Sequence, residues 1–207
     1  RADADGLDLA VVSFEPLPRE FFGRADPPAR LMLAGQKIRM LRQAGVDHIG
    51  LLRFNRALSQ TGADAFIEQL LVRRLGARAV LVGPDFRFGK NRQGDFAMLR
   101  ETGQRLGFEA FAVQAQQLDG ERISSSLVRE DLRLGRLDAA AGKLGRPYAL
   151  EGKVVRGRQL GRTLGYPTAN IRLHGRKPAL MGIYATWIYG VGEAPHARAQ
   201  RVQLLGQ

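Results

Sequence analysis

The sequence predicts an α/β protein in which an open, mostly parallel sheet is followed by a smaller β module. Three observations predict this fold. Over the first 145 residues, helical repeats of apolar side chains alternate with short apolar runs. The glycines that end three of these repeats, Gly45, Gly76 and Gly107, stand 31 residues apart, which is the length of a strand, a loop and a helix. After residue 145 the helical period disappears.

The first module is expected to contain three helices and four strands. Helices are predicted where apolar residues recur at helical spacing and a glycine follows as a left-handed cap, at residues 34–44, 63–75 and 95–106. Strands are predicted at the apolar runs 7–14, 46–54, 77–82 and 108–113. Ligands of such sheets bind beyond the carboxyl ends of the strands, so the loops that begin at residues 13, 54 and 83 are the first candidates for a site.

The second module is expected to be a small and incomplete β-barrel. Residues 148–155 and 182–189 are rich in β-forming side chains and are separated by glycines and prolines. Two or three strands do not close a barrel, and they leave open edges. We therefore divide the chain into domains at residues 1–145 and 146–207.

Composition and charge limit the class of protein. The chain has 207 residues, 44% of them hydrophobic, and no run of 18 apolar residues, so we expect a soluble protein without a membrane span. It has no cysteine, which excludes disulfides and fits a cytoplasmic location, and no export signal is visible after the first residue, Arg1. The net charge is +12, and residues 141–207 hold 11 basic against 2 acidic side chains. That part is expected to attract anions such as phosphates, unless it is simply a solvated basic face.

The loop at residues 83–94 follows a predicted strand and places Phe86 and Phe88 beside basic side chains. Exposed rings of this kind stack on a planar ligand, while Arg87, Lys90 and Arg92 neutralise its phosphate. The alternative is that both rings fold back into the core.

Residues 124–126 place three serines where a helix is predicted to begin. One serine is explained by ordinary capping. A cation in the first turn opposes the helix dipole, so Arg129 suggests that an anion such as a phosphate binds there. Neutralisation by the acidic residues that follow is the alternative.

A glycine-rich segment at residues 157–170 lies in the β module. It does not fit a P-loop, because the spacing and the required helix are absent. We interpret it as a loop that wraps a polyphosphate with backbone amides and arginine, through Gly157, Gly161 and Arg162. Thr168 and Asn170, two residues apart, offer oxygen ligands to a hard cation such as Mg²⁺, although both are also common turn residues.

Four motifs occur in an order that indicates a family. They are Phe14-Glu15-Pro16, GPDFRFG at residues 83–89, RISSS at residues 122–126 with Arg129, and GRTLGYPTAN at residues 161–170. Together they resemble the bacterial bifunctional riboflavin kinase/FMN adenylyltransferases, the FAD synthetases of prokaryotes. The resemblance implies an FMN adenylyltransferase domain at residues 1–145, with a Rossmann-like nucleotidylyltransferase parallel sheet, followed by part of a riboflavin-kinase β-barrel at residues 146–207.

The resemblance implies two reactions and their sites. The kinase moves the γ-phosphoryl group of ATP to the ribityl hydroxyl of riboflavin, and the adenylyltransferase joins FMN to AMP from a second ATP, giving FAD and pyrophosphate. The residues implied to contact the flavin are Asp85, Phe86 and Phe88. Those implied to hold ATP phosphates are Ser124, Ser125 and Arg129, and those implied to hold Mg²⁺ are Thr168 and Asn170.

Some parts of the family pattern are not found in this chain. The family's H-x-G-H loop and its first strand precede the matching region, and its catalytic glutamate lies beyond it, so the catalytic residues stay unknown and we expect little activity from the chain alone. Residues 192–207 diverge from the pattern, and Ser126 stands where threonine is usual.

Two other functions are considered. One is a nucleotidylyltransferase for another phosphorylated substrate, and the other is a basic nucleic-acid-binding module. The family resemblance favours small-molecule substrates over nucleic acid or membrane as partners, and leaves self-association open.

Overall fold

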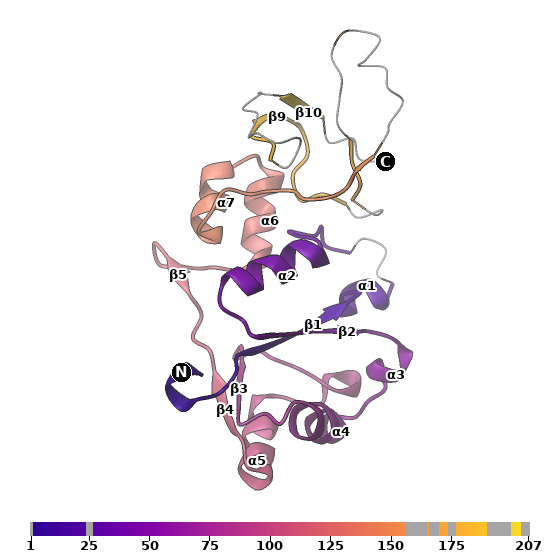
Figure 1. Ribbon diagram of the computed structural model, residues 1–207, viewed down its shortest axis with the longest axis vertical. Helices are drawn as coiled ribbons and strands as arrows, with labels where there is room; N and C mark the ends of the chain where they lie inside the picture. The colour runs from indigo at the N-terminus through magenta and orange to yellow at the C-terminus, as the bar shows by residue number, and fades with distance from the viewer. Residues whose placement is uncertain are drawn as a thin grey trace. The chain divides into compact units, whose positions relative to one another are not determined.

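The computed structural model describes residues 2–23, 27–155, 165, 170–173, 177–189 and 200–203, and shows a mixed α/β protein (Figure 1). The chain divides into two compact units. The first contains Arg1–Ala25 and His48–Arg122, and the second contains Asp26–Asp47 and Ile123–Gln207. Among the described residues, no helix combines the length and the apolar character that a membrane crossing requires.

The first unit contains two pairs of parallel strands. Strand β1 (Ala10–Glu15) pairs with β2 (His48–Arg53), and β3 (Ala79–Val82) pairs with β4 (Glu109–Ala112). All four predicted strands therefore exist and are parallel, but each pair forms its own two-stranded sheet. A short hairpin of β5 (Gln117–Leu118) and β6 (Glu121–Arg122) ends the unit.

The two longer helices of the first unit lie where the sequence predicts them. Helix α5 (Phe96–Leu106) begins after Asp95, whose carboxylate accepts the N–H of Met98 at 3.0 Å, and ends at Gly107, which has a φ of +84°. The predicted helix at residues 63–75 is α4 (Ala63–Ala65) continuing into η2 (Phe66–Arg74), which is wound as a π-helix. Shorter elements complete the unit: η1 (Asp3–Asp5), α1 (Pro18–Phe21), α3 (Arg56–Ser59) and η3 (Lys90–Arg92).

One apolar core fills the first unit. Its buried members come from α4, η2 and α5 and from two loop positions: Ala63, Ile67, Leu70, Leu71, Phe88, Leu99 and Phe108. The loop at residues 83–94 contributes Phe88 to this core, and this packing holds the loop in place at that residue.

In the described part of the second unit, three helices occur together with short antiparallel strand pairs. The helices are α2 (Ala34–Gln43), α6 (Ser125–Arg133) and α7 (Leu137–Leu144). The strand pairs are β7 (Val154–Val155) with β8 (Asn170–Ile171), and β9 (Ile183–Thr186) with β10 (Gln200–Gln203). Its core contains Val128, Leu132, Ala140, Ala179 and Leu180.

The strand predicted at residues 148–155 is wrong for most of its length, since only Val154 and Val155 pair as a strand. Two residues of this segment contact α2 instead. The Gln36 side chain donates to the carbonyl of Ala149 at 3.1 Å, and Arg39 forms an ion pair with Glu151. The Ala149 carbonyl is therefore bonded to a side chain and not to a neighbouring strand.

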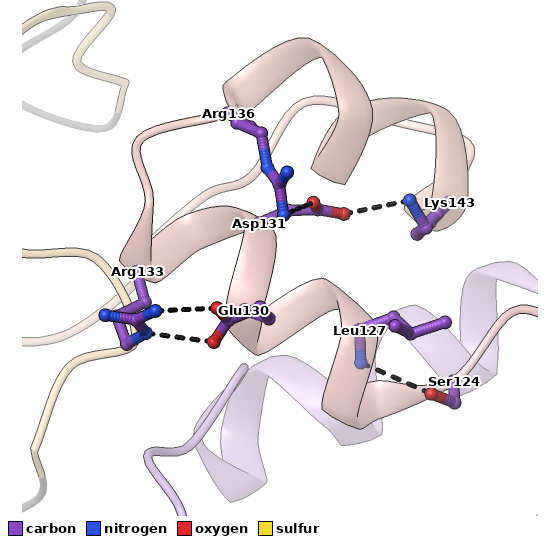
Figure 2. A network of polar contacts seen from close by, with 7 residues as sticks. All are labelled: Ser124, Leu127, Glu130, Asp131, Arg133, Arg136 and Lys143. Atoms are coloured by element: carbon purple, nitrogen blue, oxygen red, sulfur yellow. Dashed lines mark hydrogen bonds and ion pairs between the residues drawn. The ribbon is translucent and has the colours of Figure 1, made fainter.

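Ion pairs around the buried carboxylate of Asp131 connect α6 to α7 (Figure 2). The carboxylate of Asp131 is 6% exposed and lies 2.9 Å from the Lys143 ammonium and 3.1 Å from the Arg136 guanidinium. The backbone N–H of Arg136 also donates to the Asp131 carbonyl at 2.8 Å. The helix that carries the serine motif is therefore anchored at its far end.

Candidate functional site

The aromatic loop after β3 forms a stack of rings rather than two exposed rings. Phe86 stacks on Phe88 with centroids 5.5 Å apart and an interplanar angle of 21°, and Phe88 in turn lies 5.5 Å from Phe66 of η2. Phe88 is 6% exposed and belongs to the core, so the prediction that both rings are exposed is wrong for Phe88. Phe86 is half-buried and is the ring of this pair that a ligand can reach.

Close packing at two glycines fixes this loop. Phe88 and Gly94 exchange two backbone hydrogen bonds, at 3.1 and 3.0 Å, and a Cβ on Gly94 would lie 2.6 Å from the Phe88 ring. Gly89 has a φ of +73°, and a Cβ there would lie 2.7 Å from the backbone of Ala63. Both positions therefore require glycine.

One charged side chain of this loop, Arg87, already pairs with the residue that caps α5. Arg87 forms an ion pair with Asp95 at 3.0 Å. The N–H of Met98 and the Arg87 guanidinium hold the pKa of Asp95 below its ordinary range. Arg87 therefore helps to fix the start of α5, while Lys90 and Arg92 are exposed.

Asp85 has a partner that the sequence did not suggest. Its Oδ2 accepts hydrogen bonds from both Nη atoms of Arg122, at 3.2 and 3.3 Å. Arg122 ends the β5–β6 hairpin and stands 37 residues from Asp85 in the chain. The only sequence feature that pointed to Arg122 is its position as the first residue of the RISSS motif.

The serine motif forms the start of α6 (Figure 2). The Ser124 hydroxyl accepts the N–H of Leu127 at 3.2 Å, so Ser124 is the N-cap that capping rules predict. Ser125 follows as the first helical residue and is exposed. Helix geometry leaves the first backbone N–H groups without intrahelical acceptors, so this turn suits an anion.

Arg129 lies close to this turn, but not in it. It is the fifth helical residue, one turn beyond the cap, so the prediction of a cation in the first turn is wrong and the dipole argument does not apply to it. Its Nε donates to the carbonyl of Ala29 at 2.6 Å, and its Nη1 donates to the carbonyl of Ser125 at 3.0 Å. The guanidinium thus folds back along the helix towards Ser125.

The structure describes only one of the site residues predicted in the β module. Asn170 begins β8, pairs in register with Val155 and is exposed. The other residues predicted for this half lie outside the described residues: Gly157, Gly161, Arg162 and Thr168. In the part of the chain that the structure describes, no group of three or more His, Asp or Glu side chains is arranged to hold a metal.

A cluster of phenylalanine rings lies at the carboxyl ends of β1 and β2, and the sequence analysis did not predict that these rings come together. The ring of Phe54 makes edge-to-face contacts with Phe14, Phe21 and Phe22, at centroid distances of 5.3 to 5.8 Å. Phe22 is 63% exposed. The place of the Phe14-Glu15-Pro16 motif at a strand end was the available signal.

Comparisons with known proteins assign these motifs to a family. A family model described as FAD synthetase matches residues 1–127, and one described as riboflavin kinase matches residues 144–204. The curated bifunctional riboflavin kinase/FMN adenylyltransferase of Haemophilus influenzae is 44% identical over 185 residues, which cover 89% of this chain and 60% of that protein. The protein of the same name from Escherichia coli K12 is 42% identical over 189 residues, which cover 91% of this chain and 60% of that protein.

A solved structure is also similar. A crystal structure described as a macrolide-efflux protein from Streptococcus pneumoniae has a TM-score of 0.71 and 27% sequence identity, and the match covers 88% of this chain and 60% of that one.

The chain belongs to the FAD synthetase family, because that family's model matches more than half of its residues. The resemblance inferred from the four motifs is confirmed. The chain spans 60% of the length of these curated relatives.

Proposed function

We propose that this chain is a transferase with the two activities for which its relatives are named. These are ATP-dependent phosphorylation of riboflavin to FMN, and adenylylation of FMN to FAD with release of pyrophosphate. The observation that carries the proposal is the order of the two matches in one chain, FAD synthetase at residues 1–127 and riboflavin kinase at residues 144–204. The aromatic loop and the serine-capped helix start support it, because they suit a planar ring and a polyphosphate.

In the adenylyl transfer, the protein positions two nucleotides and stabilises charge. A phosphate oxygen of FMN attacks the α-phosphorus of ATP, the bond to the β-phosphate breaks, and pyrophosphate leaves. We assign Phe86 to the flavin ring, with Asp85 beside it and Phe88 supporting it from below. The first turn of α6, with Ser124 and Ser125, is assigned to the ATP phosphates.

In the kinase half, we assign Mg²⁺ to the side-chain oxygens of Thr168 and Asn170. The exposed amide oxygen of Asn170 is a ligand that a hard cation accepts. When bound with ATP, Mg²⁺ would offset the charge on the transferred phosphoryl group. Gly157, Gly161 and Arg162 are assigned to the ATP phosphates of this half.

The finer description of the fold belongs to the same proposal. The parallel pairs are assigned to a Rossmann-like nucleotidylyltransferase sheet in a domain at residues 1–145, and the antiparallel pairs to a riboflavin-kinase barrel that begins at residue 146. The named activities of the relatives support small-molecule substrates and a cytoplasmic location.

Flavin binding by the purified chain tests the proposal. Titration of riboflavin or FMN with folded chain is expected to quench flavin fluorescence, because stacking on an aromatic side chain changes the environment of the ring. Chromatography after incubation with ATP and Mg²⁺ then measures how much FMN and FAD are formed, and we expect little of either from this chain alone. A folded sample that leaves the fluorescence of both flavins unchanged would contradict the proposal.

The two alternatives predict other results. A nucleotidylyltransferase for another substrate releases pyrophosphate from ATP only with a non-flavin phosphate ester. A nucleic-acid-binding module binds generic duplex DNA with an affinity that falls steeply as salt rises, and it ignores flavin.

A further inference from the structure

The second compact unit combines segments from both family matches. It contains Asp26–Asp47, which lies in the FAD synthetase match, and Ile123–Gln207, which includes the whole riboflavin kinase match. Helix α6 begins inside the first match, and α7 ends where the second match begins. The compact unit therefore crosses the boundary between the two matched segments.

The riboflavin kinase match is buried at one short stretch of its described part. Among the residues of this match whose burial is described, the buried ones are Pro178, Ala179 and Leu180. Ala179 and Leu180 pack in one core with buried residues of α6 and α7. The kinase segment therefore buries these apolar side chains against helices that precede it in the chain.

Helix α2 and the residues before it contact the same part of the kinase segment. Leu31 packs against the second core, and Arg30 forms a backbone bridge with Pro178. Gln36, which is 4% exposed, donates to the carbonyl of Ala149 at 3.1 Å. Each of these contacts loses its partner when either segment unfolds, so they form and break together.

The helices and strand pairs of this unit are short and depend on packing for their stability. Helices α6 and α7 have nine and eight residues, whereas isolated helices shorter than about 12–15 residues are marginal in water. The strands have two residues in β7 and β8, and four in β9 and β10. Isolated strand pairs are marginal as well. Both sides therefore gain stability from the core that they share.

We propose that the riboflavin kinase segment and helices α2, α6 and α7 unfold and refold as one cooperative unit, so that a ligand bound by the kinase half also stabilises α2 and α6. A ligand that binds only the folded unit raises the free energy of opening for every residue in that unit. The two halves of the chain are then coupled through a shared opening equilibrium, without a change of the folded structure. The ligand part of the inference rests on the proposed function.

Hydrogen exchange of the full chain, measured peptide by peptide with mass spectrometry, tests the proposal. Leu180→Ala shortens a buried side chain on the kinase side, and Val128→Ala shortens one on α6, where Val128 is 2% exposed. Met181→Ala is the matched control, because Met181 is the next residue and is 46% exposed. Helix α5 belongs to the first unit and is the internal reference.

Leu180→Ala is expected to lower the protection of α2, α6 and β9 by about thirtyfold or more, as the loss of a buried leucine side chain does, and to leave α5 unchanged. Val128→Ala should lower the protection of the same three elements together, and Met181→Ala should lower none of them. If Leu180→Ala does not fold, Leu180→Val leaves a smaller cavity and permits the same comparison.

Three results would overturn the proposal. The first is a loss of protection in Leu180→Ala that is confined to the kinase segment, because the two segments then unfold separately. The second is an equal loss in α5, because the whole chain then unfolds as one unit. The third is an equal effect of Met181→Ala, because burial in the shared core is then not the cause.

Riboflavin with ATP and Mg²⁺ tests the ligand part, on the unmodified chain and on Asn170→Ala. Helix α2 is the readout, because no ligand is assigned to it. The ligands are expected to raise its protection, and Asn170→Ala should remove much of this rise, because it weakens binding in the kinase half. Protection of β9 without protection of α2 would overturn the coupling. If the ligands protect no element, the proposed function and the ligand part fail together, while the variants still decide whether the unit is shared.

Discussion

The carboxylate of Asp131 provides a quantitative test of how the second unit is held together. It is 6% exposed and pairs with Lys143, which is 12% exposed, and with Arg136, which is 55% exposed. Asp131→Asn keeps the shape of the side chain and removes the negative charge beside a poorly solvated ammonium. Breaking a buried pair in this way costs about 3–5 kcal/mol, and because water screens the Arg136 contact we expect a loss of about 3 kcal/mol.

Urea unfolding measures this loss. Circular dichroism follows the helices, and the fluorescence of Trp187, the only tryptophan of the sequence, reports on the second unit. Asp131→Asn should lower the midpoint, and adding Lys143→Met should recover part of it, because the buried site is then uncharged.

Glu130→Gln is the matched control. Glu130 is the preceding residue on α6, and its carboxylate pairs with Arg133 at 2.6 Å in solvent (Figure 2). Its replacement should shift the midpoint far less. The reasoning is refuted if the two single variants give equal shifts, or if the double variant is no more stable than Asp131→Asn.

Four further predictions follow from burial, capping and the proposed metal site. Phe88→Ala should lower the free energy of unfolding by about 3–5 kcal/mol, measured by denaturant titration, because the ring is part of the core; a loss no larger than that of an exposed phenylalanine would contradict this. The Met98 N–H lowers the pKa of Asp95, so its stabilising effect exists above its ordinary value of 3.8 and is lost as pH falls through the lower folded value; acid unfolding should show the unmodified chain and Asp95→Ala converging in stability there. Burial raises the pKa of Tyr148 to about 12, so stability should fall as pH rises from 10 towards 12, and Tyr148→Phe should remove this loss in alkaline unfolding followed by fluorescence. Asn170→Ala should weaken Mg²⁺-dependent ATP binding in the kinase half, measured by calorimetry, without changing FMN binding to the other half.

Helices and strands of the first unit were predictable because their signals are local. Asp95 and Gly107 mark the two ends of α5. The 31-residue spacing of glycines predicts the parallel direction of the strands. The winding of η2 as a π-helix was not predictable, because π-helices are rare and a helical repeat of apolar residues is first interpreted as an α-helix.

Other features could not be predicted because they depend on packing between segments that are distant in the sequence. Phe86 and Phe88 have the same chemistry and are two positions apart, yet one is reachable and the other is in the core. Residues 148–153 were predicted as part of a strand, but the Ala149 carbonyl bonds the Gln36 side chain and Glu151 pairs with Arg39. Neither the burial of Phe88 nor the contacts of residues 148–153 with α2 can be inferred from neighbouring residues in the sequence.

By itself, the sequence determined the family, the order of the two matched segments, the parallel strands and the residue types of the loops, because motifs, spacing and caps are encoded over short stretches. Only the tertiary structure decided that Phe88 supports Phe86, that Arg129 folds back towards Ser125, and that Arg122 pairs with Asp85. The physical reason is that burial and ion pairing depend on which distant segments meet. Asp85 and Arg122 stand 37 residues apart, and no local rule links them.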